Sequence, residues 1–370
     1  VRFRRIYGTG SNETTMTIYQ DSKRIVGTNA DRIGTPAVLG GWKEVARTTL
    51  GSAGDDLNVS SIPDKRYYMV LSDFQDSGNI QPALRLGNSS LDSSANYGER
   101  WSTDGRSEVT QSNTYHVQWV DVTGKTKPIF GVNYIANKSS QGKLGISHIM
   151  NNGGNGAGNA PARQESVFKW TGTSVMDILG YNNLGNGDLA SGSEVVVLGY
   201  DPDDTHTTNF WEELASVELS SAGDNLSSGT ITAKKYLWVQ VWGKATGGVI
   251  RPDFKFNNDS GNNYATRLSH DGGSDETYAS GDAIYADGGG EDWDSGGFYN
   301  MFIINNSSNE KLAIGHYIRN SATGAGTAPD RGEVFGKWAN TSAQITEIDC
   351  DAISTGQWAT GSFIKVWGSN

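Results

Sequence analysis

The residues that could carry covalent or metal chemistry are few and lie far apart in the chain. The sequence holds 5 histidines and 1 cysteine, Cys350. A nucleophilic Ser or Cys needs a base within reach, and no Gly-x-Ser-x-Gly turn joins a strand to a helix here. No two histidines stand at a metal-ligand spacing such as His-x-x-x-His. We therefore expect Cys350 to be a small core or edge residue, and His148 and His316 to form hydrogen bonds inside or at the rim of the fold.

Two acidic segments could bind calcium. Carboxylate oxygens are the ligands that Ca²⁺ prefers, and paired carboxylates also suit glycoside hydrolysis. Neither segment has the spacing of an EF-hand loop. We expect solvated loops and no cofactor, and Ca²⁺ remains the alternative at both places. The carboxylates concerned are Glu291, Asp292 and Asp294 in one segment, and Asp201, Asp203 and Asp204 in the other.

Aromatic side chains among Gly, Asn and Ser indicate a binding surface more strongly. Such rings, together with polar hydrogen-bonding groups, can grip sugars and cell-envelope polymers. Arg and Asp recur in the same segments beside a predicted turn. The alternative is that the rings cap the ends of the fold and that the charged residues maintain it. The candidate ligand-binding residues are Tyr97, Arg100, Trp101, Asp104, Tyr264, Arg267, Asp271 and Trp293.

An internal duplication organises these residues. Lys143-Leu-Gly-Ile-Ser-His148 returns as Lys311-Leu-Ala-Ile-Gly-His316, and Arg163 and Glu165 return as Arg331 and Glu333, all 168 residues later. Further matches keep the same order with offsets of 167 to 169 residues, which indicates a repeated structural unit. The predicted organisation is an arm over residues 1–41, a first repeat over 42–199, a polar linker over 200–210 and a second repeat over 211–370.

Both repeats have the pattern of β-strands joined by Gly-rich turns. The closing strands alternate, so that Val195 and Val197 face one way in the first repeat, as Ile364 and Val366 do in the second. Within each Arg-x-Glu triplet the two side chains then share a face and can pair. One weak helical window remains, residues 211–217, with 42–47 as its counterpart. We predict an all-β protein with two tandem antiparallel β-sandwiches, jelly-roll-like, behind an extended N-terminal arm.

Composition excludes several classes of function. The net charge of −11 disfavours nucleic-acid binding, because phosphate contacts need a basic surface. No run of 18 apolar residues occurs, so we expect no membrane insertion. The single cysteine allows no disulfide within the chain. Residues 1–34 are basic by contrast and include two strand-like runs, so we expect the arm to contact a like subunit or another partner, with Arg2, Arg4 and Arg5 as assembly residues. The alternatives are a solvated basic strand and an arm that packs on the first sandwich of its own chain.

Three segments carry a resemblance to a known group of proteins: residues 257–265, 331–338 and 361–368. They resemble repeated β-sandwich modules in virion proteins of tailed phages and related environmental viruses. Those proteins are described as tail-fibre, decoration or adhesion proteins. The resemblance spans both repeats but not the arm, and residues 86–90 of the first repeat depart from it.

The resemblance implies a non-enzymatic structural protein on the capsid or tail of a virion, an extracellular particle. Its expected partners are copies of itself and other virion proteins, with a host surface glycan as a further candidate. A secreted carbohydrate-binding module or lectin is the alternative. A double-sandwich capsid-shell subunit is a variant of the first function, and a glycan-cleaving enzyme that uses the acids at 291–294 is the third class.

Overall fold

The computed structural model describes residues 41–370 except 76–77, 120–127, 203, 207–208, 288–292, 294 and 321–323, and of residues 18–20, 23–26, 38–39 and 205–206 it describes the backbone alone. All regular secondary structure in these residues is β-strand. Among them there is accordingly no helix of the length and apolarity that a membrane crossing requires.

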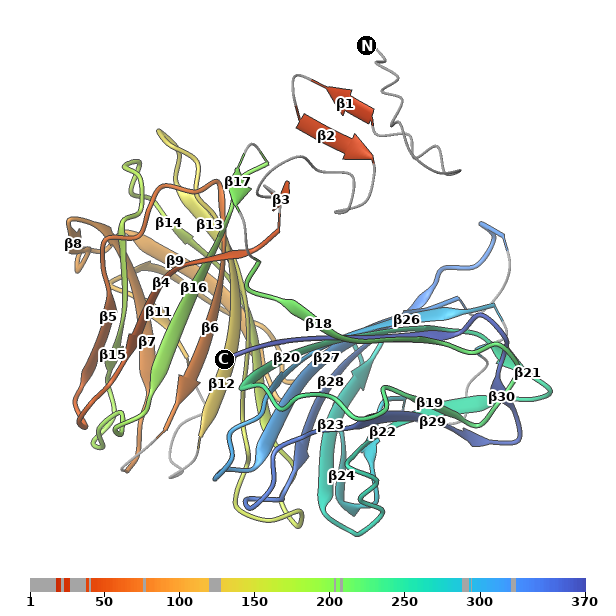
Figure 1. Ribbon diagram of the computed structural model, residues 1–370. Coiled ribbons are helices and arrows are strands. Elements are labelled where there is room, and N and C mark those ends of the chain that lie inside the picture. The colour runs from red at the N-terminus through yellow and green to blue at the C-terminus, as the bar shows by residue number, and fades with distance from the viewer. Residues whose placement is uncertain are drawn as a thin grey trace.

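The first repeat forms a sandwich of two antiparallel sheets (Figure 1). Its larger sheet has eight strands, in the spatial order β10 (Val109–Thr114), β9 (Tyr97–Thr103), β14 (Ala162–Trp170), β13 (Lys143–Asn151), β12 (Ile129–Ala136), β6 (Tyr67–Phe74), β16 (Glu194–Tyr200) and β4 (Lys43–Thr49). Its smaller sheet has the order β11 (Val117–Gln118), β7 (Pro82–Asn88), β15 (Ile178–Asn183) and β5 (Asp56–Val59), and β8 (Ser90–Leu91) pairs with β7.

The second repeat forms the same sandwich with the same connectivity. Its larger sheet has the order β18 (Glu212–Glu218), β31 (Phe363–Ser369), β20 (Tyr236–Gly243), β26 (Gly297–Ile304), β27 (Lys311–Arg319), β28 (Asp330–Trp338), β23 (Tyr264–His270) and β24 (Glu276–Gly281). Its smaller sheet has the order β19 (Asn225–Ser227), β29 (Ile348–Ser354), β22 (Ile250–Phe256) and β25 (Ile284–Tyr285). The prediction of two tandem antiparallel sandwiches is therefore confirmed.

Within the described residues, three strand pairs lie outside these sheets. The strand-like runs of the arm form a hairpin of β1 (Ile18–Gln20) and β2 (Lys23–Val26). The next strand, β3 (Val38–Leu39), pairs with β17 (Thr205–His206), so the end of the arm is joined to the segment between the sandwiches. In the second repeat β21 (Ala245–Thr246) pairs with β30 (Gln357–Trp358).

The predicted helical window is wrong in both repeats, because its residues form the edge strands β4 and β18. In each strand the register shifts by one residue, so that Val45 and Leu214 are extra residues opposite their partner strands. Such a bulge breaks the two-residue alternation of a strand. The apolar residues Trp211, Leu214 and Ala215 then recur at intervals of three and four, which imitates a helix.

The inward faces of the closing strands are as predicted. Val195 and Val197 lie fully buried in the core of the first sandwich, and Ile364 and Val366 in the core of the second. Cys350 is also fully buried in the second core, as expected.

The outward face of the first closing strand is not solvated, in contrast to the expectation for one side of an antiparallel sheet. Val196 and Leu198, on that face, are fully buried in a third apolar cluster. This cluster joins the large sheets of the two sandwiches, which lie side by side (Figure 1). Contact between the sandwiches is therefore part of the folded core and not a loose linkage.

Candidate functional site

The large sheet of the first sandwich carries an apolar groove on its outward face. Its volume is about 1010 Å³. Alternate residues of β6, β12, β13 and β14 point into it, and we call the following five side chains the groove face: Tyr67, Tyr134, Leu144, Ile146 and Val167. The exposure of three of them is unusual for apolar side chains, since Leu144 is 61% exposed, Val167 50% and Ile146 49%, whereas Tyr134 is partly buried against the third apolar cluster. An exposed, contiguous apolar patch of this kind marks an interaction surface.

Aromatic and basic side chains complete the rim of this groove. The ring of Tyr200 lies 5.7 Å from that of Trp42 and 6.3 Å from that of Tyr67, measured between centroids. Lys169 and Arg100 also line the groove, and both are exposed. Glu99 lines it too, but its carboxylate accepts hydrogen bonds from the amide of Gln118 in the smaller sheet.

The same positions of the second sandwich are buried. Tyr236, Phe302, Leu312, Ile314 and Phe335 correspond to the groove face and are at most 4% exposed. We call these five side chains the docked face, because they pack in the third apolar cluster against the first sandwich. Phe210, Trp211 and Trp238 cover part of this face from outside the first sandwich. The first sandwich contributes a different set of its own positions to the same cluster, which we call the receiving face: Leu71, Phe130, Val132, Met150 and Val196.

Ion pairs surround this apolar contact. Arg163 is 3% exposed and makes a two-pronged contact with Asp275 of the second sandwich, with Nε–Oδ2 and Nη2–Oδ1 distances of 2.9 and 2.7 Å. Arg267 lies 3.2 Å from Asp104 of the first sandwich and donates a hydrogen bond to the carbonyl of Pro161. Burial alone would lower the pKa of Arg163, but Asp275 and the neighbouring carboxylates raise it overall.

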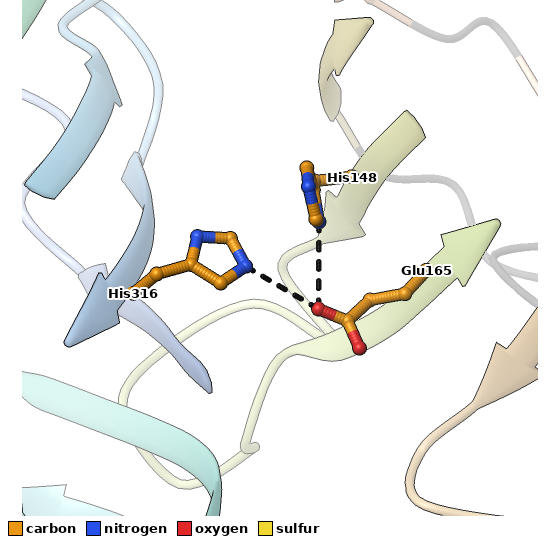
Figure 2. Close-up of side chains that lie close together, drawn as sticks. All are labelled: His148, Glu165 and His316. Atoms are coloured by element: carbon orange, nitrogen blue, oxygen red, sulfur yellow. Dashed lines mark hydrogen bonds and ion pairs between the residues drawn. The ribbon is translucent and has the colours of Figure 1, made fainter. Parts of the chain in front are cut away.

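A cluster of two histidines and one glutamate, all partly exposed, joins the two sandwiches (Figure 2). His148 Nδ1 lies 3.4 Å from Glu165 Oε1, and His316 Nε2 of the second sandwich lies 3.3 Å from the same oxygen. Burial lowers the pKa of His148. Burial would raise the pKa of Glu165, but its bonds to both histidines and the charge of Arg163 hold it well below the usual range.

Two histidines and a carboxylate are a donor set that zinc accepts, and the three ligand atoms lie within 4.8 Å of one another. The surroundings oppose a cation, however. Arg163 Nη1 lies 2.9 Å from the second oxygen of Glu165 and 3.4 Å from Glu333 Oε2. A permanent positive charge therefore already faces both carboxylates, and the cluster is best explained as a polar part of the contact between the sandwiches.

The predicted pairing within the Arg-x-Glu triplets is confirmed. Arg163 pairs with Glu165 and Arg331 pairs with Glu333, in each case along one face of a strand. The expectation for the histidines is only partly met. His148 does form an interaction with a carboxylate, but it lies between the two sandwiches and not inside one of them.

Four of the predicted ligand-binding residues have no free surface. Tyr97 and Trp101 are 2% and 5% exposed, and Tyr264 and Trp293 are fully buried. The prediction that these rings stand on polar loops is wrong, because Tyr97, Trp101 and Tyr264 lie in strands and Trp293 packs in the second core. The apolar area of such rings stabilises the fold most when it is fully buried.

The two tyrosines have equivalent structural roles. Each hydroxyl accepts a hydrogen bond from a backbone amide of the smaller sheet, Leu86 for Tyr97 at 3.0 Å and Phe256 for Tyr264 at 2.9 Å. Each hydroxyl also donates a hydrogen bond to the carbonyl of that same residue, Leu86 or Phe256. They join the two sheets of their sandwiches.

Asp104 and Asp271 occupy equivalent hairpin turns. Both have positive φ and are followed by a glycine that also has positive φ, which defines the type I′ turn that favours Asp-Gly. The carboxylate of Asp104 accepts a hydrogen bond from the Arg163 amide, and that of Asp271 from the Arg331 amide, each at 2.9 Å. Their recurrence in both repeats thus has a structural cause.

Arg100 and Arg267 are equivalent in sequence but differ in their surroundings. Arg267 faces the first sandwich, as described above. Arg100 is exposed and pairs with Glu108 at 2.6 Å beside the groove. Of the predicted ligand-binding residues, Arg100 is therefore the one that lies on the groove.

Several predicted residues lie outside the described part of the chain: Arg2, Arg4, Arg5, Asp203, Glu291, Asp292 and Asp294. Of the acidic group in the linker, Asp204 lies 2.6 Å from Lys65 and Asp201 lies 4.0 Å from Arg66. These two carboxylates face basic side chains, which disfavours a shared Ca²⁺ site.

Sequence reasoning missed the groove face. The clue was present in Leu144 and Ile146, which alternate on a strand whose other side chains include Ser147 and Ile149. Apolar residues on both faces of a strand indicate burial on both sides. That pattern pointed to a contact outside the sandwich.

The fold and these surfaces define a tandem β-sandwich protein whose two halves share an apolar contact and which exposes a second apolar surface. Neither a protein-family model nor a curated protein matches the chain. Among solved structures it is similar to domains LG4-5 of the mouse laminin alpha1 chain, at 10% identity over 90% of this chain and 92% of that chain. The TM-score of 0.17 is too low to carry an argument.

Proposed function

We propose that the protein is a non-enzymatic structural protein of a virus particle, displayed on the capsid or tail as a decoration, fibre or host-attachment component. The observation that carries this proposal is the exposed groove face. Its counterpart in the second sandwich is buried against protein. The groove face has equivalent apolar residues and is therefore suited to bind protein as well. An assembly subunit requires such a protein-binding surface.

The chemistry of the groove supports a binding role over a hydrolytic one. Glycoside hydrolysis generally needs two carboxyl groups on either side of the scissile bond. Among the described residues that line the groove, Glu99 is the one acid, and burial raises its pKa to about 7. Its side chain points to the smaller sheet, where the Gln118 amide holds it.

The arm supplies a second contact in this proposal. Residues 1–34 carry six basic and three acidic side chains, whereas the whole chain has a net charge of −11. We propose that Arg2, Arg4 and Arg5 dock on an acidic neighbour, either another copy or another virion protein. Deletion of residues 1–34 keeps β3, which pairs with the linker, so both sandwiches should still fold while attachment to the particle weakens.

The direct test is a density map of native virus particles, in which two adjoining sandwiches should be visible on the capsid or tail. Light scattering of the purified chain provides the solution test, since an assembly subunit should form species larger than a monomer. A particle that lacks this protein, together with a chain that stays monomeric, contradicts the proposal.

A carbohydrate-binding module is the second candidate, and the rings of Trp42, Tyr67 and Tyr200 at the groove favour it. Aromatic side chains bind apolar and polar ligand faces together. Glycan-array binding by a monomer, lost in Tyr67→Ala and Tyr134→Ala, would establish this function in place of the first.

A further inference from the structure

The contact between the two sandwiches is head-to-tail. The first sandwich contributes its receiving face and the second its docked face, and these apolar residues stand at different positions of the repeated unit. The equivalent histidines His148 and His316 do meet, with ring centroids 4.4 Å apart. The ion pairs are not mirrored, however, since Arg163 pairs with Asp275, whereas the equivalent Arg331 and Glu108 pair with residues of their own sandwiches. In a two-fold contact, by contrast, each sandwich would use the same positions. A head-to-tail contact always leaves one surface of each kind unpaired.

Both unpaired surfaces are present on the chain. One is the groove face of the first sandwich. The other is the receiving face of the second sandwich, made of Gln240, Phe298, Asn300, Ile318 and Lys365. It retains apolar side chains at its border, since Ile318 is 46% exposed and Trp242, 39% exposed, stacks on Phe363 with ring centroids 6.0 Å apart.

The ion pairs of the contact also have exposed counterparts on the two unpaired surfaces. Arg163 and Asp275 form a buried ion pair in the contact. The position equivalent to Arg163 is Arg331 in the second sandwich, and the position equivalent to Asp275 is Glu108 in the first. Both of these side chains are 59% exposed. Arg331 lies beside the unpaired receiving face and Glu108 beside the groove, so the two unpaired surfaces carry opposite charges at matching places.

A second ion pair of the contact likewise has exposed equivalents on the two unpaired surfaces. Arg267 and Asp104 meet within the chain, and their equivalents are Arg100 and Asp271. Arg100 is 56% exposed beside the groove, and Asp271 is exposed at the turn next to Arg331. Arg100 thus lies beside one unpaired surface and Asp271 beside the other, just as Arg267 and Asp104 lie on opposite sides of the contact within the chain.

We propose that the occupant of the groove is the second sandwich of another copy of this chain, docked as the two sandwiches of one chain dock on each other. Arg331 then pairs with Glu108 of the partner subunit, and Arg100 pairs with Asp271 of the partner subunit. Repetition of this step produces a closed ring or an open filament. The inference rests on the proposed structural function and specifies its first partner.

This contact between copies is weaker than the internal one. Gln240, Asn300 and Lys365 stand where the receiving face of the first sandwich has Leu71, Val132 and Val196. Fewer apolar atoms are removed from water, and more of the attraction comes from exposed charges, which salt screens. The association is therefore reversible and depends on protein concentration and ionic strength.

The test is a charge exchange in the full chain, followed by sedimentation velocity over a range of concentrations. Glu108→Arg and Arg331→Glu each place like charges opposite one another, and each should weaken self-association about tenfold or more. The double variant restores opposite charges in exchanged positions and should recover association. Exposed charges elsewhere provide matched controls, Glu218→Arg and Lys138→Glu, which should associate as the unchanged chain does. Thermal unfolding of every variant checks that the fold is intact.

Three results would overturn the inference. The first is a chain that remains monomeric at all concentrations. The second is association that neither single exchange weakens. The third is association that Ile146→Asp abolishes but that the double exchange fails to restore: the groove would then bind a partner in another arrangement, and the proposed structural function would survive. Glycan binding by a monomer would remove the proposed function as well.

Discussion

The two sandwiches have the same strand order but opposite surroundings on their outward faces. Leu312 and Ile314 of the second sandwich are 0% and 1% exposed, whereas Leu144 and Ile146, at the same positions of the first, are 61% and 49% exposed. The side chains are identical in both cases. Their burial is therefore decided by which partner the sheet has and not by the local sequence.

The comparison shows that the docked face of the second sandwich is buried within the chain, whereas the equivalent groove face of the first sandwich is exposed. Each buried Leu or Ile contributes about 1.5–3 kcal/mol relative to an exposed one. The second sandwich obtains this contribution from the first sandwich, while the first does not obtain it from the part of its own chain that the structure describes. The exposed copy thus has a free-energy reason to bind a partner.

The largest expected difference between equivalent positions concerns the arginines. Arg163→Ala removes a cation from a place where the Asp275 carboxylate is 2% exposed, so we expect a loss of about 3–5 kcal/mol in the free energy of unfolding. Arg331→Ala removes a side chain that is 59% exposed, and the expected loss is at most about 1 kcal/mol. Urea unfolding followed by tryptophan fluorescence, at a concentration where the chain is monomeric, measures both. Equal losses would show that the sandwiches do not pack in this way.

The next difference concerns the leucines. Leu312→Ala leaves a cavity in the contact and should lower the free energy of unfolding by about 2–5 kcal/mol. Leu144→Ala changes an exposed side chain of the groove, and we expect less than about 0.5 kcal/mol. The same denaturation measurement compares the two. A large effect of Leu144→Ala in the monomer would mean that a segment of its own chain covers the groove.

The fold could be predicted because the repeat and the two-residue alternation are local features. Val195 and Val197 share a face with spacing two, and Ile364 and Val366 repeat that pattern 169 residues later. The edge strands were missed because a bulge at Val45 and at Leu214 interrupts the same alternation. Local patterns therefore predicted strands wherever the strands were regular.

The site could be predicted only in part, because it depends on how two sheets meet. The pairing of Arg163 with Glu165 follows from positions on one strand, but the contact with Asp275 joins residues more than 100 positions apart. Tyr97 and Tyr264 were misjudged for a related reason. Their polar neighbours in sequence suggested a surface, whereas their hydroxyls bond to the opposite sheet and their rings are buried.

Where the sandwiches are alike, equal effects are expected. Tyr97→Phe and Tyr264→Phe each remove a hydroxyl that satisfies a backbone amide inside a sandwich. An unsatisfied buried amide costs about 1–3 kcal/mol, and the two variants should lose similar amounts. Calorimetric unfolding of both proteins provides the check. A marked inequality would show that the equivalence of the sandwiches does not extend to their cores.

The smallest effect concerns pH and distinguishes the sandwiches again, because the two histidines with lowered pKa among the described side chains, His116 and His148, belong to the first. Burial is the main cause at each, and it disfavours the charged ring. Below the ordinary pKa of about 6.5 the unfolded chain takes up protons that these folded histidines resist. Their contribution to the free energy of unfolding is therefore fully present above that pH and declines as the pH falls toward 5, by about 1 kcal/mol.

Carboxylates at the contact modify this decline at lower pH. Glu165, whose pKa is lowered, adds a loss of stability as the pH falls below its ordinary range. Glu333, whose pKa burial and the charge of Glu165 raise, acts in the opposite sense and partly offsets the decline. Urea denaturation between pH 7 and 5 should show a shallower dependence in His148→Gln and the shallowest in the double variant with His116→Gln. If the double variant keeps the full dependence, the buried histidines are not its source, and the pH response of the two sandwiches must be assigned to the carboxylates that they share.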